Sequence, residues 1–129
     1  LGLGIPIFGI CLGHQLLALA HGAVTQKLKY GHRGVNQPVK FSDSGRVYVT
    51  SQNHGYAVVS QSLPEGAQLM CVSMNDGTCE GVKYNDGSYS VQFHPEAGAG
   101  PHDTRFLFDE FAQKVCSYAK VKTAEAIAR

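Results

Sequence analysis

The 129-residue sequence has no excess of charge of either sign, since 11 Lys and Arg stand against 10 Asp and Glu. This balance excludes the strongly basic surface of many nucleic-acid-binding and membrane-binding proteins. We therefore expect neither nucleic acid nor a membrane as a partner. The sequence also lacks an uninterrupted hydrophobic run, because glycines and polar residues break the apolar stretch of residues 5–20. A membrane span and a secretion signal are excluded on that ground, which predicts a cytoplasmic protein.

No C-x-x-C pair occurs among the four cysteines, at positions 11, 71, 79 and 116. Their spacing indicates neither a zinc site nor a disulfide framework, and free thiols in a reducing compartment fit better. No nucleotide-binding motif, internal repeat or low-complexity tract is present. A length of 129 residues with 43% hydrophobic content fits one globular domain.

An initiator methionine is also lacking, and the chain opens on Leu-Gly-Leu-Gly. The first predicted strand, residues 5–10, already leads into the candidate active site. In α/β folds the strand that carries a nucleophile is usually central. We therefore expect this chain to lack the N-terminal part of its domain.

The most informative segment is residues 8–15, Phe-Gly-Ile-Cys-Leu-Gly-His-Gln. It runs from an apolar strand through Cys11 into a helix predicted over residues 13–21. A nucleophile on such a turn takes an unusual backbone conformation, for which we expect Gly9 and Gly13 to provide clearance. The helix N-terminus favours a thiolate over a thiol. The alternative is a buried structural cysteine beside two loop glycines.

From residue 23 onward, short strands separated by turn sequences are predicted, so this half of the chain is β-rich. Alternating apolar and polar residues indicate half-buried strands over residues 47–52 and 69–74. A further apolar strand is predicted over residues 89–93.

A last helix follows a glycine-rich loop, with Asp103 as its candidate N-cap. We expect its apolar positions to pack on the sheet; these are Phe106, Leu107, Phe111 and Val115. Residues 1–119 are predicted to form the domain, and residues 120–129 a tail, either a frayed helix or a linker.

His94 is the strongest candidate for a base that serves Cys11. It follows a predicted strand, and the carboxyl ends of parallel strands meet at one sheet edge. Glu96 lies two residues further on, which predicts a Cys-His-Glu triad. The alternative is a His94 that bonds a loop carbonyl beside a solvated Glu96. His54 is the second candidate, although its polar turn, residues 51–55, favours ligand binding. The remaining histidines are expected to be structural, and we expect no metal site; they are His14, His21, His32 and His102.

Three segments together resemble class I glutamine amidotransferase domains: residues 9–15, 51–56 and 91–96. Within that family the chain is most similar to the small, glutamine-hydrolysing component of carbamoyl-phosphate synthetase. The resemblance implies an α/β fold, a flavodoxin-like open sheet that is mostly parallel, with a nucleophile elbow and an added β-rich segment. The resemblance to this component in particular rests on residues 16–20, 30–38 and 100–104.

The resemblance also implies a role for each site residue. Cys11 is the expected nucleophile, His94 the general base and acid, and Glu96 the carboxylate that orients His94. The expected substrate-binding residues are Leu12, whose backbone N–H serves the oxyanion, Gln15, Asn53, Gly55 and Tyr56. These residues would hydrolyse L-glutamine through a γ-glutamyl thioester.

The resemblance further implies a partner, a large ATP-dependent synthetase subunit or fused domain. Ammonia would pass to it through a tunnel and would be used to make carbamoyl phosphate for arginine and pyrimidine synthesis. No cofactor is expected in this chain, since ATP and magnesium belong to the partner.

Members of the family also carry an earlier glycine-rich loop that supplies a second oxyanion N–H. Loss of one such donor costs about 3 kcal/mol, so we expect the isolated chain to be weak or inactive. Three alternatives remain: a glutaminase of another synthetase, a γ-glutamyl hydrolase or peptidase-like relative, and a non-catalytic fragment that binds the synthetase.

Overall fold

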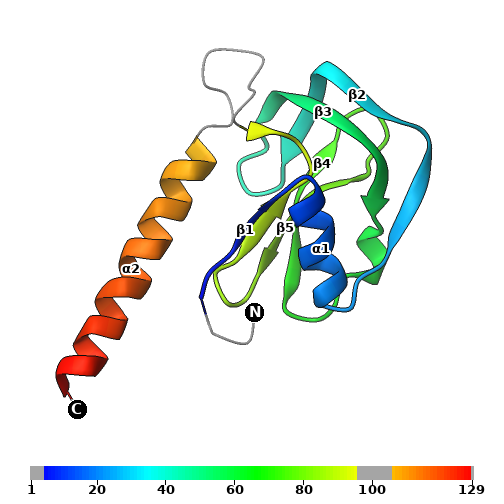
Figure 1. The fold of residues 1–129 in the computed structure, drawn as a ribbon. Coiled ribbons are helices and arrows are strands. Elements are labelled where there is room, and N and C mark those ends of the chain that lie inside the picture. The colour runs from blue at the N-terminus through cyan, green and yellow to red at the C-terminus, as the bar shows by residue number, and fades with distance from the viewer. Residues whose placement is uncertain (1–4, 96–105, 129) are drawn as a thin grey trace.

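The computed structural model describes residues 5–95 and 106–128, in which helices and one sheet form an α/β unit (Figure 1). Within these residues six strands lie in the order β1-β6-β5-β4-β2-β3. The elements in chain order are β1 (Phe8–Ile10), α1 (Leu12–Ala20), β2 (Thr25–Phe41), β3 (Val47–Val58), the short 3-10 helix η1 (Ser60–Ser62), β4 (Ala67–Ser73), β5 (Cys79–Tyr84), β6 (Tyr89–Val91) and α2 (Phe106–Ala128).

The predicted α/β class is confirmed, but the described sheet is mostly antiparallel, which differs from the mostly parallel sheet expected. Only β1 and β6 pair in parallel, with Ile10 opposite Val91. The other four pairings are antiparallel. The physical reason is the short connection between successive strands: a tight turn can only return the chain antiparallel, whereas a parallel neighbour needs a longer crossover.

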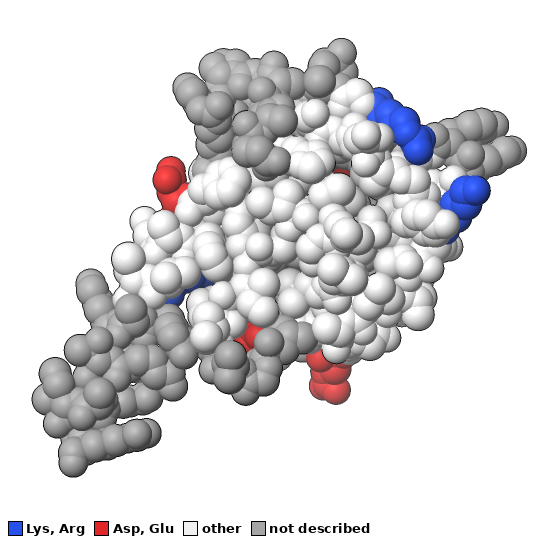
Figure 2. Space-filling view, in the orientation of Figure 1, with Lys and Arg blue, Asp and Glu red and all other residues white. Residues whose placement is uncertain are grey.

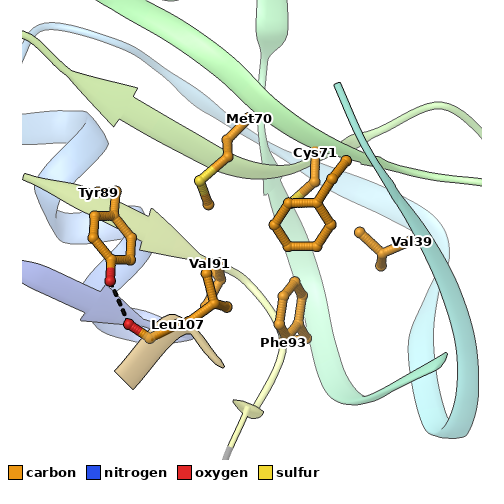
Figure 3. Close-up of a cluster of buried hydrophobic side chains, with 8 residues drawn as sticks. Val39, Met70, Cys71, Tyr89, Val91, Phe93 and Leu107 are labelled. Carbon is orange, nitrogen blue, oxygen red and sulfur yellow. Dashed lines mark hydrogen bonds between the residues drawn. The ribbon is translucent and has the colours of Figure 1, made fainter. Parts of the chain in front are cut away.

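The two helices cover opposite faces of the sheet, and β6 shows this by alternation. The Tyr89 hydroxyl donates to the Leu107 carbonyl of α2, whereas the Ser90 hydroxyl meets the His14 ring of α1. The core on the α2 side is built from a cluster of buried residues, most of which Figure 3 labels: Val39, Phe41, Met70, Cys71, Tyr89, Val91, Phe93 and Leu107. The α1 side buries a second cluster: Leu17, Ala18, Ala23, Val58, Cys79, Val82 and Tyr84.

Helix α2 docks only through its first turns. Phe106, Leu107 and Phe111 pack on the core as predicted. Val115 is 41% exposed, so its predicted packing is wrong. Figure 1 shows why, because α2 runs away from the sheet after its N-terminal turns. The helix continues without a break past residue 119, and the division into a domain and a tail stays a prediction.

The elbow helix matches its prediction closely. α1 begins at Leu12 and ends at Ala20, one residue from each predicted end. Gly22 follows with φ 92°, a left-handed conformation that suits glycine after a helix. Asp103, the candidate N-cap of the second helix, lies outside the described residues.

Candidate active site

Cys11 occupies the turn between β1 and α1 in a strained conformation, with φ 55° and ψ −107°. Within residues 5–95 and 106–128 it is the only residue other than glycine with positive φ. Its backbone N–H donates to Val91 O at 2.9 Å, and Gln15 N–H donates to Cys11 O at 3.2 Å. The unusual backbone predicted for this position is confirmed, and such strain is typical of functional turns.

The two flanking glycines differ in what they do. A Cβ on Gly9 would lie 2.8 Å from Gly13 O and 2.9 Å from Gly13 C, which backbone atoms cannot accommodate. A Cβ on Gly13 would meet nothing within 4 Å. The predicted clearance is therefore real at Gly9 and wrong at Gly13, because the first turn of α1 crosses over β1 at Gly9 while Gly13 faces open space.

His94 leaves the sheet beside Cys11. It lies three residues after Val91, which pairs in parallel with Ile10, so both residues follow neighbouring strands at the same sheet edge. His94 N–H donates to Ser51 O at 3.0 Å, which ties this segment to β3. The side chain is half-buried. Glu96, the predicted third member of the triad, lies outside the described residues, as does His102.

The predicted binding segment of β3 reaches the elbow helix through Gln15. The Gln15 side-chain amide donates to Tyr56 O at 3.3 Å. Asn53 and Tyr56 are exposed and Gly55 is half-buried. Leu12 is exposed at the start of α1, so its backbone lies directly beside Cys11. The structure thus gathers the elbow and β3 in one region; the binding roles of these residues stay predictions.

Beneath this segment, β3 presents buried polar side chains. The Thr50 hydroxyl donates to Gln37 O at 2.7 Å and accepts a hydrogen bond from Gln52 Nε2 at 2.8 Å. The Gln37 carbonyl can only accept, which orients the chain of bonds and leaves Gln52 Oε1 as the acceptor for His54 Nε2 at 2.8 Å.

His54 is therefore held inside the protein rather than offered to a substrate. Its second ring nitrogen, Nδ1, donates to Tyr56 O at 2.8 Å. Since both nitrogens donate, the bond pattern assigns an imidazolium. Glu80 Oε1 lies 3.9 Å from Nε2, and both side chains are buried. His54 is thus a poor candidate for the base, and the position inside the sheet follows from strand alternation.

His14 confirms its expected structural role on the elbow helix. Its ring is fully buried, and Nδ1 lies 2.7 Å from Ser90 Oγ. Burial lowers the pKa of His14 to about 3, and the neighbouring His54 lowers it further in the same direction. His14 Nε2 has no hydrogen-bond partner among the described residues. A neutral ring under the site is the consequence.

The four cysteines are free, as predicted, but their surroundings differ. Cys71 and Cys79 are buried, and burial raises the pKa of the Cys71 thiol well above its ordinary value and that of Cys79 to about 12. Cys11 is half-buried and Cys116 exposed. Among these thiols, only Cys11 combines access to solvent with a strained turn at a helix N-terminus.

Three polar residues of the site were missed from the sequence: Glu80, Ser90 and Gln92. All three are fully buried on strands or directly after one. The available pattern was a polar residue at every second position of an otherwise apolar strand, Ser90-Val91-Gln92-Phe93. That pattern also fits a solvent-exposed face, so the sequence alone did not assign these side chains to the interior.

The surface around these elements carries few charges in the described residues. Figure 2 shows a largely uncharged face with basic and acidic side chains toward its rim. Among the described residues no group of three His, Cys, Asp or Glu side chains could hold a metal ion. Neither of the helices that the structure describes is long and apolar enough to cross a membrane.

Comparison with known proteins agrees with this architecture. The model of the family "Glutamine amidotransferase class-I" matches residues 1–114. The chain is 56% identical over 115 residues to the carbamoyl phosphate synthase small chain of Methanococcus maripaludis, covering 84% of this chain and 31% of that protein. It is 53% identical over 117 residues to the small chain of Lactococcus lactis subsp. cremoris, covering 90% of this chain and 33% of that protein. The chain belongs to the class I glutamine amidotransferase family.

A solved structure shows the same fold. It is that of a GMP synthase component from Thermoplasma acidophilum, with a TM-score of 0.78 and 25% identity, covering 92% of this chain and 61% of that one. The predicted family and α/β fold are therefore confirmed. The chain spans about a third of the length of the curated small chains that it matches.

Proposed function

We propose that this chain carries the glutamine-hydrolysing site of a carbamoyl phosphate synthase small chain, with Cys11 as nucleophile. The observation that supports this most is the parallel register of β1 and β6, with Ile10 opposite Val91. It places the strained Cys11 turn and the His94 segment at one sheet edge. The small chains quoted above, more than 50% identical over most of this chain, favour this function over that of other glutaminases.

In the proposed reaction the Cys11 thiolate attacks the side-chain amide carbon of glutamine and forms a C–S bond. The backbone N–H of Leu12 donates to the oxyanion. The C–N bond then breaks, and ammonia leaves with a proton from His94. Water, deprotonated by His94, cleaves the γ-glutamyl thioester and releases glutamate, which returns the thiolate. Glu96 orients the His94 ring, as in other triads.

The substrate is held by the segment of β3 that Gln15 joins to the elbow. The exposed Asn53 and Tyr56, with Gly55 between them, face the solvent side of this strand. Backbone and amide groups of this kind suit the α-amino and α-carboxylate groups of glutamine. Gln15 contacts the substrate from α1.

The proposed partner is a large ATP-dependent synthetase subunit or fused domain, which takes the ammonia and makes carbamoyl phosphate for arginine and pyrimidine synthesis. ATP and magnesium belong to that partner. The proposed compartment is the cytoplasm, which the four free thiols favour because a reducing compartment keeps thiols unpaired.

The test is covalent labelling by a chloroketone analogue of glutamine, read by intact mass. We expect one adduct on Cys11, protection by free glutamine, and no adduct in Cys11→Ser. A small haloacetamide serves as the reagent that does not need the pocket. Alkylation of Cys11 by the haloacetamide without labelling by the chloroketone would contradict a formed glutamine site in this chain.

A further inference from the structure

Gln92 lies between the candidate nucleophile and the binding segment without belonging to either. It follows β6 directly, and its side chain is fully buried on the α1 side of the sheet. Its amide nitrogen lies 3.8 Å from Cys11 Sγ. Its amide oxygen accepts a hydrogen bond from Gln15 Nε2 at 3.0 Å. A buried amide with both ends occupied in this way has one orientation.

That orientation is set by a carbonyl that can only accept. Tyr56 O receives a hydrogen bond from Gln15 Nε2, so the Gln15 amide nitrogen faces this region. The same nitrogen donates to Gln92 Oε1, which turns Gln92 Nε2 toward Cys11. The backbone of Gln92 is fixed as well, because its N–H donates to Glu80 O at 2.8 Å. The polarity of the chain therefore runs from Tyr56 to the sulfur.

We propose that Gln92 is a positioning residue for Cys11, whose amide N–H donates to the sulfur and thereby favours the thiolate and fixes its direction. This inference rests on the proposed nucleophilic role of Cys11. A thiolate accepts a hydrogen bond more strongly than a thiol, so the donor favours the reactive form. Because the same amide accepts from Gln15, the direction of the sulfur is coupled to the strand that holds the substrate.

Two substitutions separate the two ends of this amide. Gln92→Glu keeps an acceptor for Gln15 but replaces the donor to Cys11 by a carboxylate oxygen, which repels a thiolate. Gln92→Met removes both ends with little change of volume. Gln113→Glu, an equal change on the exposed face of α2, is the matched control. All variants carry Cys116→Ser, since Cys116 is the other exposed thiol among the described residues.

The experiment measures haloacetamide alkylation of Cys11 against pH, with folding checked by urea denaturation. In Gln92→Glu we expect the profile to move to higher pH and the rate at pH 7 to fall about tenfold or more. Gln92→Met should move in the same direction by less, and Gln113→Glu should match the parent. A purely structural role would change the denaturation midpoint and leave the pH profile of the folded protein unmoved.

The outcomes distinguish this inference from the proposed function. If folded Gln92→Glu and Gln92→Met both keep the parent profile, Gln92 does not act on the sulfur and the inference is wrong. If Gln92→Glu does not fold, Gln92→Met decides alone, since it adds no charge. Failure of the parent chain to react with the chloroketone contradicts the proposed function instead, and the haloacetamide profiles still decide the role of Gln92.

Discussion

The elbow and the hairpin of β2 and β3 adjoin one another but are specified in different ways. The elbow is short, and its shape follows from local backbone requirements at Gly9 and Cys11. The hairpin is long, and its inner face carries Thr50, Gln52 and His54, which are polar and buried. These side chains are satisfied only by partners elsewhere in the fold.

The difference shows how a site can combine two kinds of precision. Backbone contact leaves the elbow little freedom, because close-packed backbone atoms cannot move aside. The hairpin depends on a directed network, in which each bond requires the previous one. Steric substitutions should therefore damage the elbow, and substitutions that remove a charge or a donor should damage the hairpin.

The largest effect is expected for His54→Leu. It leaves Glu80 buried without the imidazolium 3.9 Å away and removes the donor to Tyr56 O. Removal of one partner of a buried charged pair typically costs about 3 kcal/mol or more. Urea denaturation measures the loss in free energy of unfolding. The double variant with Glu80→Gln should recover part of it; a loss below about 1 kcal/mol in the single variant would show that the pair is not charged.

Gly9→Ala tests the elbow by steric means. The added Cβ meets the Gly13 carbonyl at 2.8 Å, and the backbone must shift. Overpacking of this kind costs about 1–3 kcal/mol, and we expect a value near the upper end. The same variant should lose chloroketone labelling at Cys11, because the strained turn depends on this contact. Labelling at the parent rate would contradict the proposed importance of the contact.

Acidification should weaken the protein through His14. Burial lowers the pKa of His14 to about 3, below its ordinary value of 6.5, so the unfolded state binds a proton that the folded state excludes. This contribution to stability is present above pH 6.5 and is lost as the pH falls toward 3. The slope approaches about 1.4 kcal/mol per pH unit. Denaturation at several pH values should show a flatter dependence in His14→Gln than in the parent.

Gly13→Ala is expected to have the smallest effect, with the opposite sign. Its Cβ meets nothing within 4 Å, and the residue lies in the first turn of α1. Replacement of a helical glycine by alanine stabilises by about 0.5–1 kcal/mol. The thermal midpoint of this variant should equal or exceed that of the parent. A clear destabilisation would mean that the elbow needs glycine at both positions.

Much of the fold and of the candidate site follows from the sequence where the requirement is local. The strand, turn and helix around Cys11 could be predicted because hydrophobic period and glycine spacing act over a few residues. The position of His94 followed from one general property of parallel strands. Val115 was misplaced, because periodicity describes the apolar face of α2 but not where the helix leaves the sheet.

The sequence by itself determined the elbow, the order of the strands along the chain and the free state of the thiols. The tertiary structure alone decided which polar residues turn inward, because alternation has two equivalent faces and only packing chooses between them. It placed Glu80 against His54, Ser90 against His14, and Gln92 between Cys11 and Gln15. Such contacts join residues far apart in the chain, and a bond between buried groups is specified by both partners and by the fold that brings them together.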